Sequence, residues 1–94
     1  MREIDVRIMP AGAGYVAEVA VRDGGRATRH RVRLPAAALE QLAPGADPAA
    51  LVRRSFEFLL EREPQETILR EFEIDVIPRY FPEYPKEIRR RLTE

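Results

Sequence analysis

The sequence predicts a single α+β domain over residues 1–94. A three-stranded antiparallel meander packs on one main α-helix, and short C-terminal helices cover the other side of that helix. Three observations lead to this prediction. Polar and apolar residues alternate through residues 1–34, as in half-buried strands. Apolar residues recur at helical spacing within residues 35–64. Prolines then divide residues 65–94 into short helical pieces, which we expect to wrap around the main helix.

Three segments of alternating polarity form the predicted meander. In the first, Ile4, Val6 and Ile8 share one side of the strand, and the second and third segments cover residues 15–21 and 26–34. PAGAG separates the first two segments. Its glycines precede a strand, whereas a phosphate-binding loop leads into a helix, so we interpret it as a turn.

The second turn of the meander contains DGG, and glycine is favoured in two-residue hairpin loops. A loop at residues 23–24 would place Glu18 opposite Arg29, whereas a loop at residues 24–25 would place Glu18 opposite Arg31. Both registers pair opposite charges on the outer face of the sheet. The sequence therefore predicts the hairpin and leaves its register open.

The helical third begins with a short helix, LPAAALEQL, that opens at Pro35 and stops before a Pro-Gly pair. The main helix follows, with Asp47 as its N-cap, Pro48 in its first turn and Pro64 beyond its end. Its apolar residues form a stripe too wide for burial against one sheet: Leu51, Val52, Phe56, Phe58, Leu59 and Leu60. We expect the meander to cover one side of this helix and residues 65–94 to cover the other.

The stretch RYFPEYP gathers aromatic residues and prolines near the end of the sequence. Its prolines are expected to end one short helix and begin the next. Tyr80, Phe81 and Tyr84 are expected to form a lid over the outer side of the main helix, because a domain of this size needs that burial. The alternative is a partner-binding surface, since tyrosine is favoured at interfaces.

The formal net charge is zero, but counting gives about +3 for residues 1–35, about −5 for residues 36–75 and about +2 for the tail. Four arginines follow the second turn of the meander and are candidates for contact with RNA or DNA phosphates: Arg26, Arg29, Arg31 and Arg33. No aromatic residues are interleaved on that face to stack with bases. A solvated outer sheet face is therefore the favoured interpretation.

Histidine, serine and cysteine, three residue types that act in catalysis or bind metal ions, are rare or absent in the sequence. His30 is the only histidine and Ser55 the only serine, and neither lies in a nucleophile motif. The chain has no cysteine and no recognisable metal-binding motif. Glu57 and Glu61 lie one helical turn apart beside arginines, which is typical of a solvated, ion-paired face. We expect no enzymatic activity, no cofactor and no metal site.

Three motifs resemble a family of short bacterial proteins of unknown function. They are SFEFLLEREP, ILR-x-F and YFPEY, and the resemblance covers residues 52–88. It implies no activity, cofactor or catalytic residue. Lys86 is the only lysine and asparagine is absent, a composition that suits a GC-rich genome or a thermophile.

Taken together, these features predict a small non-enzymatic protein-interaction or regulatory module. The alternative is a nucleic-acid-associated, antitoxin-like protein that uses the arginine-rich strand. The sequence opens without a signal-peptide pattern, and no stretch approaches the ~20 apolar residues of a membrane span. We therefore expect a cytoplasmic protein without membrane contact. Its expected partner is a second copy paired at an open strand edge, or an unidentified protein.

Overall fold

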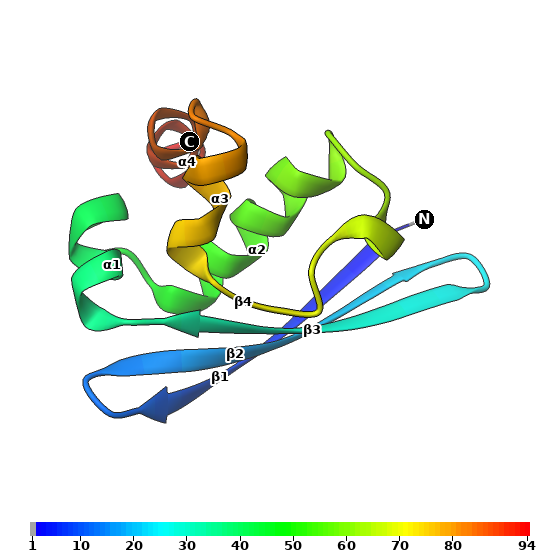
Figure 1. The fold of residues 1–94 in the computed structure, drawn as a ribbon, viewed down its shortest axis with the longest axis horizontal. Helices are drawn as coiled ribbons and strands as arrows, with labels where there is room; N and C mark the ends of the chain where they lie inside the picture. Colours follow the sequence, from blue (N-terminus) through cyan, green and yellow to red (C-terminus); the bar gives the residue numbers. More distant parts are fainter. Residues whose placement is uncertain (1) are drawn as a thin grey trace.

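The computed structural model describes residues 2–94, which form a four-stranded mixed sheet with helices on one of its faces (Figure 1). The strands are β1 (Arg2–Ala11), β2 (Gly14–Asp23), β3 (Arg26–Leu34) and β4 (Glu71–Glu73). The α-helices are α1 (Ala36–Leu42), α2 (Pro48–Leu60), α3 (Ile77–Tyr80) and α4 (Tyr84–Leu92). Two 3-10 turns, η1 (Gln65–Thr67) and η2 (Ile74–Val76), flank β4. The predicted α+β class is confirmed, and the sheet differs in detail from the prediction.

Strands β1, β2 and β3 form an antiparallel meander, and the strand order of the sheet is β1-β2-β3-β4. The turn between β2 and β3 consists of Gly24 and Gly25, which places Glu18 opposite Arg31. Gly24 has a φ of +63°, a conformation that glycine adopts without steric cost. The structure thus selects the second of the two registers that the sequence left open.

Strand β4 corrects the prediction of a three-stranded, fully antiparallel sheet followed by an entirely helical tail. The N–H of Arg31 donates to the carbonyl of Arg70 at 2.7 Å, and Phe72 lies beside Val32 in parallel register. Phe72 is buried whereas Glu71 is exposed, as expected for a strand. The segment is only three residues long, too short for a period of two to be recognised in the sequence.

Helix α2 is covered on two sides by aromatic side chains. Phe56 faces the sheet, where its ring centroid lies 5.2 Å from that of His30 and 6.3 Å from that of Phe72. Phe58 faces the C-terminal segment, and its ring lies 5.3 Å from that of Tyr84. This two-sided burial explains why the apolar stripe of α2 is so wide.

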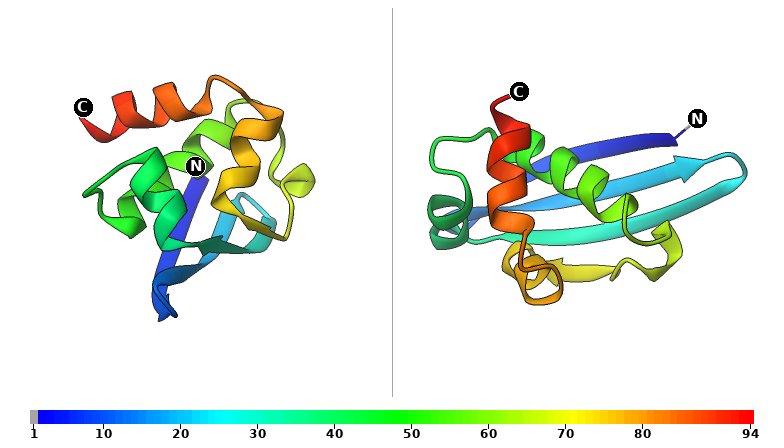
Figure 2. Two further views of the ribbon diagram at one scale, coloured as in Figure 1. Left: turned by 60° about the vertical axis from the view of Figure 1, so that its left-hand side comes forward. Right: turned by 90° about the horizontal axis from the view of Figure 1, so that it is seen from above.

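Helix α4 lies on the side of α2 that faces away from the sheet, and α3 lies beside α2, next to β4 (Figure 2). Pro78 and Pro85 occupy the first turns of α3 and α4, where a proline costs no backbone hydrogen bond. Ile88 of α4 is fully buried, and the guanidinium of Arg89 donates to the carbonyl of Leu42 at 2.9 Å. The tail is therefore held to both α2 and α1.

Two local features fix how the helices leave the sheet. The Asp47 carboxylate caps α2 by accepting the N–H of Ala50 at 3.1 Å. At Gly14, a Cβ atom would lie 2.2 Å from the carbonyl oxygen of Leu34, so only glycine allows the start of β2 to approach the end of β3 this closely. No helix of residues 2–94 has both the length and the apolar composition needed to cross a membrane.

Candidate functional site

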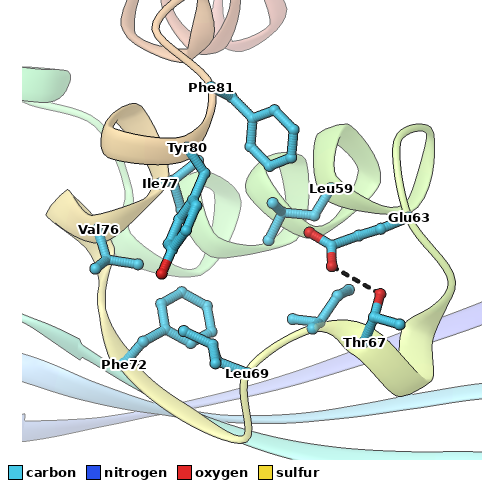
Figure 3. Close-up of a pocket in the computed structure, with 10 residues that line it drawn as sticks. Leu59, Glu63, Thr67, Leu69, Phe72, Val76, Ile77, Tyr80 and Phe81 are labelled. Atoms are coloured by element: carbon cyan, nitrogen blue, oxygen red, sulfur yellow. Dashed lines mark hydrogen bonds between the residues drawn. The ribbon is translucent and has the colours of Figure 1, made fainter.

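A hollow in the surface lies between the end of α2 and the segment from η1 to α3 (Figure 3). It has a volume of about 410 Å³ and is open to solvent on one side. We call it the tail groove, and it is lined by Leu59, Glu63, Thr67, Ile68, Leu69, Phe72, Val76, Ile77, Tyr80 and Phe81. Of these residues, the sequence predicted only Tyr80 and Phe81 as part of a lid or partner surface.

The floor and the rim of the tail groove differ in exposure. The floor consists of core side chains that are at most 5 % exposed, namely Leu59, Ile68, Phe72 and Ile77. At the rim, Leu69 is 49 % exposed and Tyr80 is 67 % exposed. Met9 is the third large apolar side chain of residues 2–94 with comparable exposure, and it lies in β1. Single exposed apolar side chains are common on protein surfaces. Here two of the three border the same groove, and such clustering is typical of binding surfaces.

One carboxylate faces the interior of the tail groove. Glu63 accepts a hydrogen bond from the Thr67 hydroxyl at 2.8 Å (Figure 3). Its neighbour Arg62 turns elsewhere, stacking 3.6 Å from the ring centroid of Phe58 and pairing with Glu83 at 3.2 Å. Among residues 2–94, no arginine or lysine lies within 4 Å of the Glu63 carboxylate. Glu63 therefore leaves uncompensated negative charge in an otherwise apolar groove.

The three tail aromatics, expected as one lid or one partner surface, take three different positions. Tyr84 is fully buried, and its hydroxyl lies 2.6 Å from the Ser55 hydroxyl. Because Ser55 donates to the carbonyl of Leu51 at 2.7 Å, the Tyr84 hydroxyl donates to Ser55. Burial raises the pKa of Tyr84 well above its usual value. Phe81 is half-buried against Phe58.

Tyr80 differs from its two neighbours because its ring lies at the surface, over the tail groove (Figure 3). The prediction that all three rings form one lid over the outer side of the main helix therefore needs correction, because Tyr80 is exposed. Phe81 and Tyr84 pack edge-to-face against Phe58, whereas Phe56 is turned toward the sheet.

Three of the four candidate phosphate-binding arginines lie next to carboxylates. Arg31 pairs with Glu18 at 2.7 Å, Arg33 with Glu71 at 3.0 Å, and Arg26 with Glu66 at 3.3 Å. Arg29 stands opposite Ala20, and no carboxylate of residues 2–94 lies within 4 Å of its guanidinium. The carboxylates contributed by β4 and η1 were not foreseen, because the sequence did not reveal that these segments adjoin β3.

A chain of buried hydrogen bonds joins β3 to the segment that borders the tail groove. The Gln65 amide donates to the Thr28 hydroxyl at 3.3 Å and to the Val21 carbonyl at 3.1 Å. The Thr28 hydroxyl lies 2.9 Å from Nε2 of His30, and Nδ1 of His30 lies 2.9 Å from the Leu69 carbonyl. A carbonyl can only accept, so Nδ1 carries a proton, and in the neutral ring Nε2 accepts a hydrogen bond from the Thr28 hydroxyl.

Burial favours the neutral imidazole ring over the charged one. Burial lowers the pKa of His30, and the positive charge of Arg70 lowers it further, against the raising effect of the Leu69 carbonyl. His30 and Ser55 belong to separate hydrogen-bonded sets, since Ser55 bonds to Leu51 and Tyr84. The geometry fits a structural role for both residues: His30 fixes the backbone of Leu69, a rim residue of the tail groove.

Within residues 2–94, no cluster of three or more histidine, cysteine, aspartate or glutamate side chains has the geometry to hold a metal ion. Comparisons with known proteins find no matching family model, no matching curated sequence and no matching solved structure. The resemblance of residues 52–88 to a family of short bacterial proteins therefore stays a prediction.

Proposed function

We propose that this protein is a non-enzymatic protein-interaction module that binds a short segment of a partner protein in the tail groove. The segment presents one large apolar side chain to the groove and carries a lysine or arginine close to it. The observation that carries the proposal is the pairing of exposed Leu69 and Tyr80 across a groove whose floor is hydrophobic core.

The apolar part of the partner follows from the size and lining of the groove. A volume of about 410 Å³ is at the small end of ligand-binding sites, which are roughly 300–1,000 Å³. One large side chain and its neighbouring backbone would fill it. Because the groove is open along one side, it suits a protruding segment of a larger molecule better than a small molecule that must be enclosed. Tyrosine at the rim also favours protein contacts.

The basic part of the partner follows from charge. Glu63 faces the groove without an arginine or lysine partner in residues 2–94. Residues 61–76 contain six acidic and two basic side chains, a balance of −4. A lysine or arginine next to the apolar anchor would pair with Glu63, partly shielded from solvent, where such pairs set orientation and specificity.

The contacts of the arginine-rich strand favour protein binding over nucleic-acid binding. Arg26, Arg31 and Arg33 each lie within 3.3 Å of a carboxylate, so a phosphate would have to displace these pairs. The alternative is tested directly by replacing Arg29 and Arg31 together with glutamate. Loss of RNA or DNA retention in that variant would support the alternative, and unchanged peptide binding would separate the two surfaces.

The proposal is tested with a random-peptide library selected on the purified protein. We expect the selected peptides to share a large apolar residue with lysine or arginine nearby. Replacing Leu69 and Tyr80 with serine should weaken their binding by about tenfold or more, since buried apolar anchors dominate interfaces. Glu63→Gln should weaken binding less and remove much of its salt dependence.

Met9→Ser is the matched control, because it removes an exposed apolar side chain from β1, outside the tail groove. This variant should bind the peptides as the unchanged protein does. Equal weakening by Met9→Ser and by the groove variants would contradict the proposal. So would a consensus that lacks the apolar residue or is enriched in acidic residues.

A further inference from the structure

Strand β1 forms one edge of the sheet, and no strand of residues 2–94 pairs with its outer side. It is ten residues long, Arg2–Ala11, and pairs only with β2 (Figure 2). A long edge strand with unpaired backbone groups is a template for pairing with another strand. Proteins commonly cover such edges, and the residues of β1 indicate what fits against this one.

The direction of the backbone groups follows from the hairpin. The Gly12-Ala13 loop leaves Ala11 opposite Gly14, and this flanking pair exchanges hydrogen bonds in a two-residue hairpin. Backbone groups alternate along a strand, so those of Ile4, Val6 and Ile8 point away from β2. Two observations agree with this parity. The carbonyl of Ile4 accepts a hydrogen bond from Arg53 on α2, so it points away from β2. Pro10 has no N–H to donate, and it is also one of the residues whose backbone groups point away from β2.

We propose that β1 pairs with β1 of a second copy of this chain, antiparallel and centred on Val6, to form a continuous eight-stranded sheet from two four-stranded ones. The symmetry is two-fold, with the axis perpendicular to the sheet at Val6. Val6 then exchanges two backbone hydrogen bonds with Val6 of the partner subunit. The helices of both subunits lie on the same face of the combined sheet.

The register follows from the charges on the outer face of β1. Centred on Val6, the pairing places Asp5 opposite Arg7 of the partner subunit, and the symmetry repeats this pair. Centring on Asp5 would oppose two aspartates, and centring on Arg7 would oppose two arginines. Like charges directly opposite each other destabilise a sheet. A shift by one residue would place the apolar side chains of one strand opposite the charged side chains of the other.

Arg7 in particular lacks a partner within its own chain. It stands opposite Glu18, but Glu18 is paired with Arg31 at 2.7 Å. Among residues 2–94, no carboxylate lies within 4 Å of the Arg7 guanidinium. Asp5 contacts Arg22 at 3.3 Å and remains 71 % exposed, so it can accept a second arginine.

The apolar side chains on the inner face of β1 support the same register, centred on Val6. Ile4, Val6 and Ile8 are only half-buried, although they face the core. The register places Ile4 opposite Ile8 of the partner subunit, so each half-buried side chain gains an apolar neighbour. The Arg53 contact does not block this pairing, because the Ile4 carbonyl has a second lone pair for the incoming N–H.

The dimer is tested by sedimentation velocity from micromolar to millimolar concentration. We expect a reversible dimer with a micromolar Kd, because pairing of one strand buries a small area for a stable interface. Arg7→Asp should raise the Kd by about tenfold or more, since both symmetric pairs become repulsive. Adding Asp5→Arg to that variant should restore dimerisation, because the charges are then exchanged on both strands.

A cysteine at the two-fold axis tests the register independently of charge. The chain has no cysteine, and Val6→Cys would place two thiols opposite each other, within reach of a disulfide. Oxidation should link this variant into dimers faster than it links Asp5→Cys or Arg7→Cys. A monomer at all concentrations would overturn the proposal. So would a dimer that is unaffected by the charge exchange, or that is linked best at Asp5 or Arg7.

Discussion

The contrast between Tyr84 and Tyr80 gives the sharpest test of how the tail is divided. Tyr84 has no exposed surface and hydrogen-bonds to Ser55, whereas Tyr80 is 67 % exposed. Replacing each with alanine makes the same chemical change in two environments. The difference in the free energy of unfolding between the two variants therefore reports the burial of Tyr84 together with its hydrogen bond to Ser55.

The magnitude for Tyr84 can be worked from its burial. A buried aromatic side chain removes about 150–250 Å² from water, and about 25 cal/mol per Å² gives about 4–6 kcal/mol, an upper bound. Core aromatic-to-alanine changes cost about 3–5 kcal/mol. We expect Tyr84→Ala to cost about 4 kcal/mol, a large share of the roughly 5–15 kcal/mol that stabilises a domain. Tyr84→Phe should cost about 1 kcal/mol, because Ser55 keeps its bond to Leu51.

The assay is urea denaturation followed by circular dichroism, with all variants fitted to a common slope. Tyr80→Ala should change the free energy of unfolding by no more than about 0.5 kcal/mol, as exposed positions do. A loss from Tyr80→Ala similar to that from Tyr84→Ala would refute the division of the tail into core and groove. A loss of less than about 1 kcal/mol from Tyr84→Ala would refute the core role of Tyr84.

Three other predictions concern the sheet and the tail. Burial lowers the pKa of His30, so as the pH falls the unfolded chain takes up a proton at His30 before the folded chain does. The free energy of unfolding, measured by urea titration, should therefore fall as the pH drops below about 6.5. His30→Gln should make it less dependent on pH. Gly14→Ala should lower the free energy of unfolding by about 1–3 kcal/mol in the same titration, because the added methyl group would collide with the Leu34 carbonyl. Gly25→Ala should not lower it in this way, because a methyl group there would meet open space. Truncation after Ile77 should abolish the cooperative thermal transition, and a melt like that of the intact chain would contradict the core role of α4.

The sequence predicted the parts of the fold that depend on local patterns. Alternation and the DGG turn located the meander, and Asp47 with Pro48 located the start of α2. Strand β4 was missed because its pairing with β3 is decided by contacts between residues far apart in the chain, such as Arg31 with Arg70. No pattern within three residues encodes that choice.

The candidate site was predicted only in part, for the same reason. Tyr80 and Phe81 were identified from the aromatic cluster, but Glu63 and Leu69 face the groove only because β4 and η1 bring their segment beside α3. The carboxylates that contact Arg26 and Arg33 come from that segment too. Charge counting along the chain could not show which acids would meet which arginines.

The parallel pairing of β3 with β4 has a consequence for the order of folding. The antiparallel meander closes short loops, whereas β4 joins β3 only after the intervening helices are in place, and such long loops close at a greater entropic cost. We therefore expect the meander to gain structure before β4 docks. The amide of Arg31, which donates to Arg70, should exchange its hydrogen faster than amides between β2 and β3. If the Arg31 amide is as protected as those amides, the sheet opens as one unit.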